Sequence, residues 1–170
     1  AAGRLLASVV LADAQAAISV MEGTVNGAGS ALADVSADYD LDKATLHAES
    51  ANWLRNVTDV PLFFNTVSGL GSPWWQADVE PRFSRAAQVD AAIVAVLESI
   101  AFLLAVNIEY MGRLLGDAAD IVVTGGLGSV DPLLQRLADL TGCRVLRADV
   151  REATATGLAF LVAGMPETWP

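Results

Sequence analysis

The residues best suited to chemistry lie in a glycine-rich turn between a predicted strand and a predicted helix. The apolar run Ile121–Thr124 predicts a buried strand. The segment after it, called here the glycine turn, consists of Gly125, Gly126, Leu127, Gly128 and Ser129. Glycines let a backbone approach a ligand closely, and a helix N-terminus offers unpaired N–H groups at the positive end of its dipole. The pattern therefore predicts a site for a phosphate or for the sugar–phosphate edge of a nucleotide.

The glycine turn matches neither of the two common nucleotide motifs. It lacks the Gly-Lys-Ser/Thr ending of a Walker A motif, and its spacing differs from that of the dinucleotide fingerprint. Pro132 is compatible with the first turn of the next helix, where its missing N–H is harmless. Considered alone, the pattern also fits a tight strand-to-helix turn that needs glycine for its backbone, so both interpretations stay open.

The other candidate residues have structural interpretations. His47 has no Ser, Asp or Cys at a triad-like or metal-like spacing, which indicates a surface residue. Glu98, inside an apolar helix, is expected to accept hydrogen bonds from a nearby loop, and Cys143 to be a small buried hydrophobe. Trp74 and Trp75 fit either stacking on a base or sugar or packing at the mouth of a cleft. No set of carboxylates on the predicted strands suits a two-metal nuclease.

The spacing of apolar residues and the positions of turn-forming residues predict a series of strands and helices around these residues. Strands are expected at Leu5–Leu11, Ala16–Met21, Pro61–Thr66, Ile121–Thr124 and Cys143–Leu146. Helices are expected at Ser30–Val35, Asp42–Arg55, Arg85–Leu115, Ser129–Leu140 and Arg151–Ala163. Asp-Ala-Gln would turn the first two strands into a hairpin, Asp40 or Asp42 would cap the second helix, and Gly116 would end the third. This order indicates a mixed α/β sheet layered by helices.

Composition excludes several classes of protein. The chain has 170 residues, of which 54% are apolar, with 20 acidic and 10 basic residues and a formal charge of −10. Disorder is excluded by the apolar content, and nucleic-acid binding is disfavoured by the charge. A single cysteine excludes a disulfide scaffold and favours a reducing, cytoplasmic setting. The size fits one domain, and an apolar chain that begins without methionine is expected to be a fragment with a face for a partner domain.

Membrane and export signals are weak. The most apolar stretch, Ala91–Val106, is interrupted by Glu98 and Ser99, and its apolar runs are shorter than the roughly 20 residues that span a bilayer. It therefore predicts a buried core helix and no membrane contact. Residues 4–14 faintly mimic a signal peptide, but only one basic residue precedes the apolar run, so a hairpin strand is favoured.

Six ordered segments together resemble a known family. They are Met21–Val25, Ala28–Leu32, Phe64–Trp75, Leu97–Phe102, Val123–Gly126 leading into Gln135–Asp139, and Arg151–Ala159. In this order they resemble the C-terminal domain of the FGGY carbohydrate kinases, which include glycerol, xylulose, gluconate and ribulose kinases. The resemblance implies a ribonuclease-H-like (actin-like ATPase) lobe with a mixed five-stranded sheet flanked by helices.

The resemblance also implies that nucleotide binding and sugar binding belong to different domains. Residues 1–165 would form the nucleotide-binding domain, with a helical insert at about 28–56 and a tail at 166–170. The N-terminal sugar-binding domain, with the general-base aspartate and a Thr-Gly-Thr phosphate loop, would be absent from this chain. The parent protein would transfer the γ-phosphoryl group of ATP, with Mg²⁺, to a sugar or polyol, while the isolated fragment would be inactive. A homo-oligomer is one option for its assembly.

The resemblance assigns nucleotide-binding residues but no catalytic residue and no metal ligand. The nucleotide-binding residues would be Gly29, Gly125, Gly126, Gly128 and Ser129. Two departures from the family concern the adenine contacts: Ala33 replaces a polar amide or acid, and Val130 replaces an asparagine. They imply either a more apolar adenine pocket or weak ATP binding. A non-catalytic actin-like ATP-binding or structural/assembly module therefore stays open as the alternative function.

Overall fold

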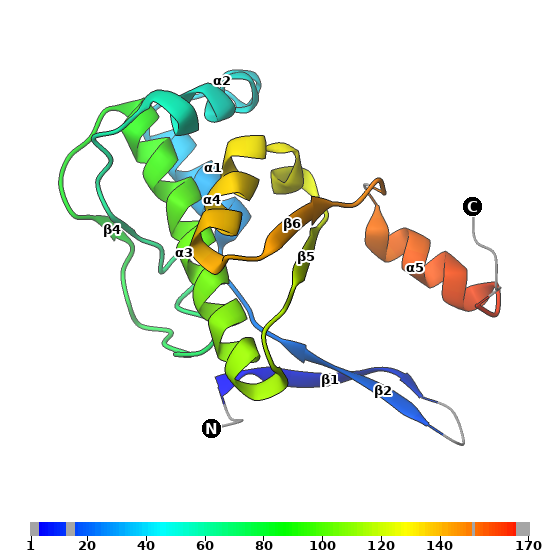
Figure 1. The fold of residues 1–170 in the computed structure, drawn as a ribbon. Helices are drawn as coiled ribbons and strands as arrows, with labels where there is room; N and C mark the ends of the chain where they lie inside the picture. The colour runs from blue at the N-terminus through cyan, green and yellow to red at the C-terminus, as the bar shows by residue number, and fades with distance from the viewer. Residues whose placement is uncertain (1–3, 13–15, 151, 166–170) are drawn as a thin grey trace.

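The computed structural model describes residues 4–12, 16–150 and 152–165 (Figure 1). The strands are β1 (Leu6–Ala12), β2 (Ala17–Glu22), β3 (Phe63–Phe64), β4 (Arg82–Phe83), β5 (Asp120–Val123) and β6 (Arg144–Arg147). The helices are α1 (Ala28–Asp38), α2 (Lys43–Asn56), α3 (Val89–Leu115), α4 (Asp131–Thr141) and α5 (Ala153–Val162), with a 3-10 turn η2 (Gly126–Ser129) before α4. Each predicted strand and helix is present in some form, and the structure adds β4, which was not predicted.

The strands form three separate two-stranded sheets in the described part of the chain. β1 and β2 are antiparallel, β3 and β4 are antiparallel, and β5 and β6 run parallel from Asp120↔Arg144 to Val123↔Arg147. The expected single five-stranded sheet is not found among these residues. A physical reason lies in β3, which has only two residues and pairs locally with β4, where the rings of Phe63 and Phe83 lie 4.6 Å apart.

The predicted hairpin is present as β1 and β2, which pair from Leu6↔Glu22 to Ala12↔Ala17 with an irregularity between Val9 and Leu11. Its predicted Asp-Ala-Gln turn lies outside the described residues. Most of its apolar side chains are exposed, because the hairpin extends away from the helices (Figure 1). The hairpin therefore contributes little to the core.

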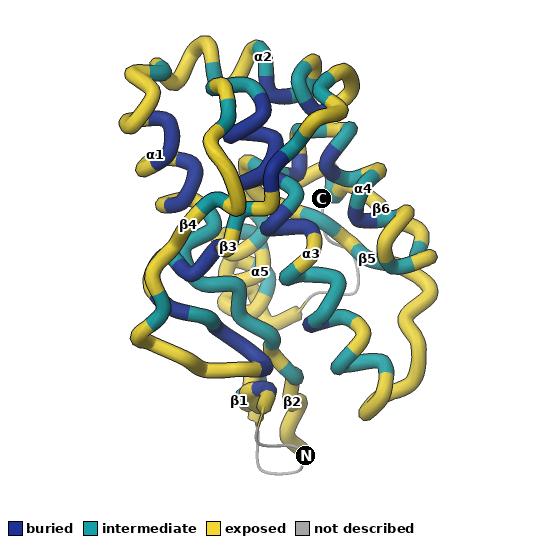
Figure 2. Tube along the Cα trace, turned by 90° about the vertical axis from the view of Figure 1, so that its left-hand side faces the viewer, coloured by how far each residue is buried: buried dark blue, intermediate teal, exposed yellow. Residues whose placement is uncertain are grey.

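The core is built around α3. Ala92, Ile93, Val94 and Val96 are fully buried on this helix, and α1, α2 and α4 pack against it. Figure 2 shows the buried residues concentrated on these helices. By length and composition alone α3 could cross a membrane, but 61% of its most apolar window is buried inside the fold. α3 is therefore the core helix of the molecule, and Gly116 ends it at φ 90° as predicted.

Polar contacts fix the helices and the Gly- and Pro-rich loop. Glu98 on α3 pairs with Arg136 on α4 at 3.1 Å between carboxylate and Nε, so its partner is a helical arginine and not the expected loop. In the loop, Ser72 Oγ donates to Asn107 Oδ1 of α3 at 2.8 Å and accepts from the backbone N–H of Thr24 at 2.5 Å. These bonds tie the end of β2, the loop and α3 together.

The last helix lies apart from this body. α5 has no buried residue, and Leu158 and Val162 are 63% and 81% exposed. Figure 1 shows α5 beyond the β5–β6 pair, separate from the other helices. The predicted tail, 166–170, lies outside the described residues. α5 therefore adds secondary structure but almost no core.

Candidate nucleotide-binding site

A cavity of about 1050 Å³ lies between the first two helices and the end of the β5–β6 pair. Its walls come from α1, α2, the glycine turn and the segment that follows β6. Its volume is at the upper end of the range of small-molecule sites, roughly 300–1000 Å³. A nucleotide is a ligand of suitable size for such a space.

The glycine turn forms one wall. Gly125 adopts φ 86°, a left-handed value that favours glycine, and η2 follows directly. A Cβ atom added at Gly125 or Gly126 would meet nothing within 4 Å, whereas one at Gly128 would lie 3.3 Å from Val123 Cγ1. Gly125 and Gly126 therefore have open space where a side chain would lie, whereas Gly128 packs against the protein.

The helix after the turn starts later than predicted. Residues 126–129 form the 3-10 turn, and α4 begins at Asp131 with Pro132 in its first turn. The hydroxyl of Ser129 donates to the carbonyl of Gly126 at 2.8 Å. Ser129 therefore helps to shape the turn, which is a structural role beside the predicted nucleotide contact.

All five residues predicted to bind nucleotide line this one cavity: Gly29, Gly125, Gly126, Gly128 and Ser129. Gly29 lies just before the predicted helix start at Ser30, and the structure places it in the first turn of α1, where Gly27 adopts φ 65° and the N–H of Ala31 donates to the Gly27 carbonyl at 2.7 Å. A Cβ at Gly29 would meet nothing within 4 Å. The long sequence separation between Gly29 and the glycine turn is thus closed by the fold.

Other parts of the cavity lining are mostly apolar and include the two departures from the family pattern. Ala33 on α1 and Val130 beside α4 both line the cavity, together with Leu32 and Leu46. His47 is exposed, as expected of a surface residue, but its place on the cavity wall was not predicted. The Trp74 and Trp75 side chains are not among the lining residues described, and Trp75 Nε1 donates to the carbonyl of Arg4.

Three charged residues line the cavity that were not predicted there from the sequence: Lys43 on α2, Arg147 at the end of β6, and Glu152 before α5. Arg147 Nε donates to the carbonyl of Gly128 at 2.6 Å, and its guanidinium pairs with Asp131. A signal for Arg147 was available, because the carboxyl ends of neighbouring parallel strands meet at one edge of a sheet, where ligands bind.

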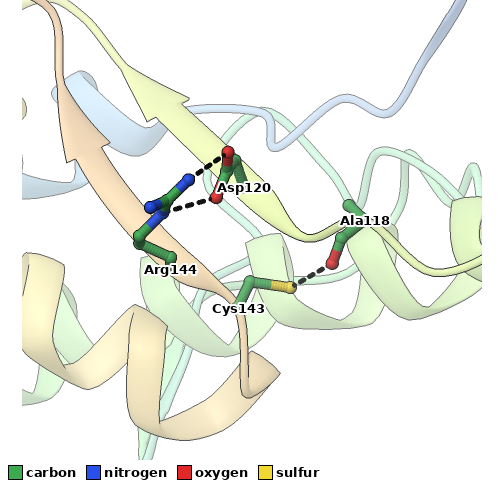
Figure 3. Close-up of polar contacts among 4 residues, drawn as sticks. All are labelled: Ala118, Asp120, Cys143 and Arg144. Carbon is green, nitrogen blue, oxygen red and sulfur yellow. Dashed lines mark hydrogen bonds and ion pairs between the residues drawn. The ribbon is translucent and has the colours of Figure 1, made fainter.

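The opposite end of the β5–β6 pair carries a separate ion pair (Figure 3). Arg144 Nε and Nη2 lie 2.7 and 2.8 Å from the two carboxylate oxygens of Asp120. The hydrogen bond from Arg144 lowers the pKa of Asp120, and the same bond raises the pKa of Arg144. Beside them the half-buried thiol of Cys143 contacts the carbonyl of Ala118 at 3.1 Å. Neither Cys143 nor this ion pair lines the cavity.

Metal binding has little support from side chains. Within residues 4–12, 16–150 and 152–165, no group of three or more His, Cys, Asp or Glu side chains could hold a metal ion. Glu152 supplies the one carboxylate in the cavity lining that the structure describes. A divalent cation here would depend mainly on oxygens from a ligand such as a polyphosphate.

The comparison with protein families decides the identity. Residues 8–165 match the family described as "FGGY family of carbohydrate kinases, C-terminal domain". The chain belongs to this family. The resemblance inferred from the six sequence segments is therefore confirmed, and it covers most of the FGGY chain.

Curated relatives agree with the family assignment. The FGGY chain is 32% identical over 166 residues to a glycerol kinase of Halothermothrix orenii, covering 88% of this chain and 31% of the relative. It is 38% identical over 125 residues to a glycerol kinase of Variovorax paradoxus, covering 67% of this chain and 24% of the relative. The FGGY chain thus spans about a quarter to a third of the length of these relatives.

Solved kinase structures share the fold. The Plasmodium falciparum glycerol kinase with ADP superposes with a TM-score of 0.79 at 19% identity, covering 96% of this chain and 34% of that one. A ligand-bound xylulose kinase from Lactobacillus acidophilus gives 0.68 at 19% identity, covering 97% and 34%. The expected mixed α/β, actin-like fold class is confirmed by these neighbours, whereas the five-stranded sheet is not.

Proposed function

We propose that this chain is the nucleotide-binding C-terminal domain of an ATP-dependent sugar or polyol kinase. The observation that carries the proposal is the cavity of about 1050 Å³ that brings Gly29 and the glycine turn together. Glycines with open space where a side chain would lie give a ligand direct access to the backbone. Membership of a kinase family supports ATP as that ligand.

Two sets of lining residues suit different parts of the nucleotide. The backbone of Gly125 and Gly126 would lie against the ribose and α-phosphate, where a side chain would obstruct the ligand. The apolar lining residues, which include Ala33 and Val130, would accept the base mainly through van der Waals contact. Because these two positions lack polar side chains, we expect the base to be held less specifically than in relatives with an amide there.

The proposed reaction needs parts beyond this chain. Bound ATP would supply the γ-phosphoryl group, with Mg²⁺ neutralising charge on the phosphates during in-line transfer. Residues 1–165 would hold the nucleotide, while an N-terminal domain outside the chain would bind the sugar or polyol and provide the general base. We expect the isolated chain to bind ATP without transferring phosphate, and the parent enzyme to act in the cytoplasm.

Titration calorimetry of the purified chain with Mg-ATP tests the proposal. We expect measurable binding that Gly126→Leu abolishes, because the new side chain fills the open space of the cavity without meeting the protein. Gly157→Leu on α5 is the matched control, because Gly157 is equally free of neighbours but does not line the cavity. The proposal fails if the wild-type chain does not bind ATP or if Gly126→Leu binds it equally well. Tight binding by the isolated chain would favour the alternative, a non-catalytic ATP-binding module.

A further inference from the structure

Arg147 links two segments that border the cavity. It is the last residue of β6, and its Nε donates to the carbonyl of Gly128 at 2.6 Å. The Nη2 atom of the same guanidinium pairs with the carboxylate of Asp131, the first residue of α4. One side chain therefore holds both η2 and the start of the helix that follows it.

We propose that Arg147 is a positioning residue for the nucleotide site, which fixes the glycine turn and neutralises Asp131 beside it. The inference rests on the proposed function, because it assigns a role in nucleotide binding. Arg147 itself lines the cavity, and its side chain is 48% exposed. The Arg147 side chain therefore lies at the site and stays partly exposed to solvent.

The first part of the role is geometric. The other hydrogen bonds described for this segment are local to it: Gly128 N–H to Gly125, Ser129 Oγ to Gly126 and Val130 N–H to Leu127. The side chain of Leu127 packs against the hydrophobic core, so the bond from Arg147 adds a restraint on the glycine backbone itself. Glycine backbones have large conformational freedom, so ordering them for a ligand has an entropic cost. A charge-assisted hydrogen bond from β6 reduces this cost before the ligand arrives.

The second part of the role is electrostatic. Asp131 is 72% exposed and stands at the junction of η2 and α4, next in the chain to Val130 of the cavity lining. The whole chain carries a formal charge of −10, so an unpaired carboxylate here would add to the repulsion of a polyphosphate. Pairing with Arg147 cancels this local charge and keeps the α4 N-terminus favourable for anions.

Arg144 provides a matched control on the same strand. It forms an ion pair with Asp120 across β5 and β6, at the end of the strands away from the glycine turn (Figure 3). Its side chain is 69% exposed, and it does not line the cavity. Removing Arg144 therefore tests the loss of an interstrand ion pair without a change at the site.

Two measurements test the inference on the 170-residue chain. We expect Arg147→Met to weaken Mg-ATP binding about tenfold in calorimetry, the size expected for one lost charge-assisted contact. Arg147→Lys should recover only part of this, because lysine keeps the charge but lacks the planar fork. The double variant Arg147→Met/Asp131→Asn should bind more tightly than Arg147→Met, since the unpaired carboxylate is gone. Arg144→Met should bind like the wild type.

Amide hydrogen exchange gives a readout that needs no nucleotide. In the free chain, Arg147→Met should speed exchange at Gly128, whose N–H is bonded within the turn, while Arg144→Met should leave it unchanged. Wild-type binding and exchange in Arg147→Met would overturn the inference, as would equal losses in Arg147→Met and Arg144→Met. Failure of the wild-type chain to bind ATP would instead overturn the proposed function.

Discussion

Asp42 shows how a single side chain prepares one wall of the cavity. It caps α2, with Oδ1 accepting from the N–H groups of Ala44 and Thr45 at 2.9 and 3.0 Å and Oδ2 accepting from the Thr45 hydroxyl at 2.7 Å. The bond from the Thr45 side chain, followed by that from the Thr45 backbone, lowers the pKa of Asp42 below its ordinary 3.8. α2 carries Lys43 and His47 into the cavity lining, so this cap helps to place them.

A lowered pKa makes the contribution of the cap depend on pH. The stabilisation is fully present above the unfolded pKa of about 4 and declines as the pH falls through the lower folded pKa. We therefore expect the difference in unfolding free energy between wild type and Asp42→Ala to shrink between pH 4 and pH 2. Urea unfolding across this range measures it. Asp42→Asn keeps a hydrogen-bond acceptor that does not titrate, so its difference in unfolding free energy from Asp42→Ala should not change with pH. A difference between wild type and Asp42→Ala that stays constant over this range would contradict the prediction.

Residues that depend on local sequence were the easiest to predict. Asp42 was one of two predicted caps, because an acidic side chain before an apolar-periodic segment is a local signal. The glycine turn was visible for the same reason. Gly29 was found through the family resemblance, whereas the bond from Arg147 to Gly128 was missed, since it depends on strands that pair across α4. Local spacing contains no record of that pairing.

At the scale of elements, α3 determines stability because the other helices of the body pack on it. Ile93 is fully buried near the N-terminal end of α3, whereas Leu115 at its C-terminal end is 69% exposed. Ile93→Ala should lower the free energy of unfolding by about 2–5 kcal/mol, since it removes buried apolar surface and leaves a cavity. Leu115→Ala should have a much smaller effect. Urea unfolding monitored by circular dichroism measures both, and equal effects would contradict α3 as the core helix.

Element type was predictable, but pairing was not. The long apolar pattern of α3 and the short β-rich runs of the hairpin gave the correct structure, because both signals are local. β3 was predicted over Pro61–Thr66 and reduces to Phe63–Phe64, and its partner β4 was not predicted. A two-residue strand has no period to detect, and its pairing depends on the packing of Phe63 on Phe83. The prediction of one five-stranded sheet was wrong for the same reason, because the pairing of strands depends on packing between distant segments.

At the scale of the whole molecule, one group of apolar side chains that the core does not cover lies on the β1–β2 hairpin, β5 and α5. They are Leu6, Val9, Val10, Ile18 and Val20 on the hairpin, Val122 on β5, and Leu158, Leu161 and Val162 on α5. The hairpin and the β5–β6 pair also have strand edges that pair with no other strand in the described part of the chain. Unpaired edges and apolar patches favour association. The high apolar content of the sequence thus belongs partly to α3 and partly to this surface.

Repulsion between chains of charge −10 opposes association through these exposed apolar side chains and strand edges. Because salt screens this repulsion, the degree of association should depend on ionic strength. We expect sedimentation velocity to show concentration-dependent self-association that increases with ionic strength as repulsion is screened. Val9→Lys should reduce it, because Val9 is 61% exposed on β1 and a charged edge resists strand addition. Asn52→Lys, at an exposed site on α2, matches the change in charge without removing an apolar side chain. Equal effects of the two variants would assign association to net charge alone, and a monomer at all concentrations and salts would show that the exposed strands do not pair.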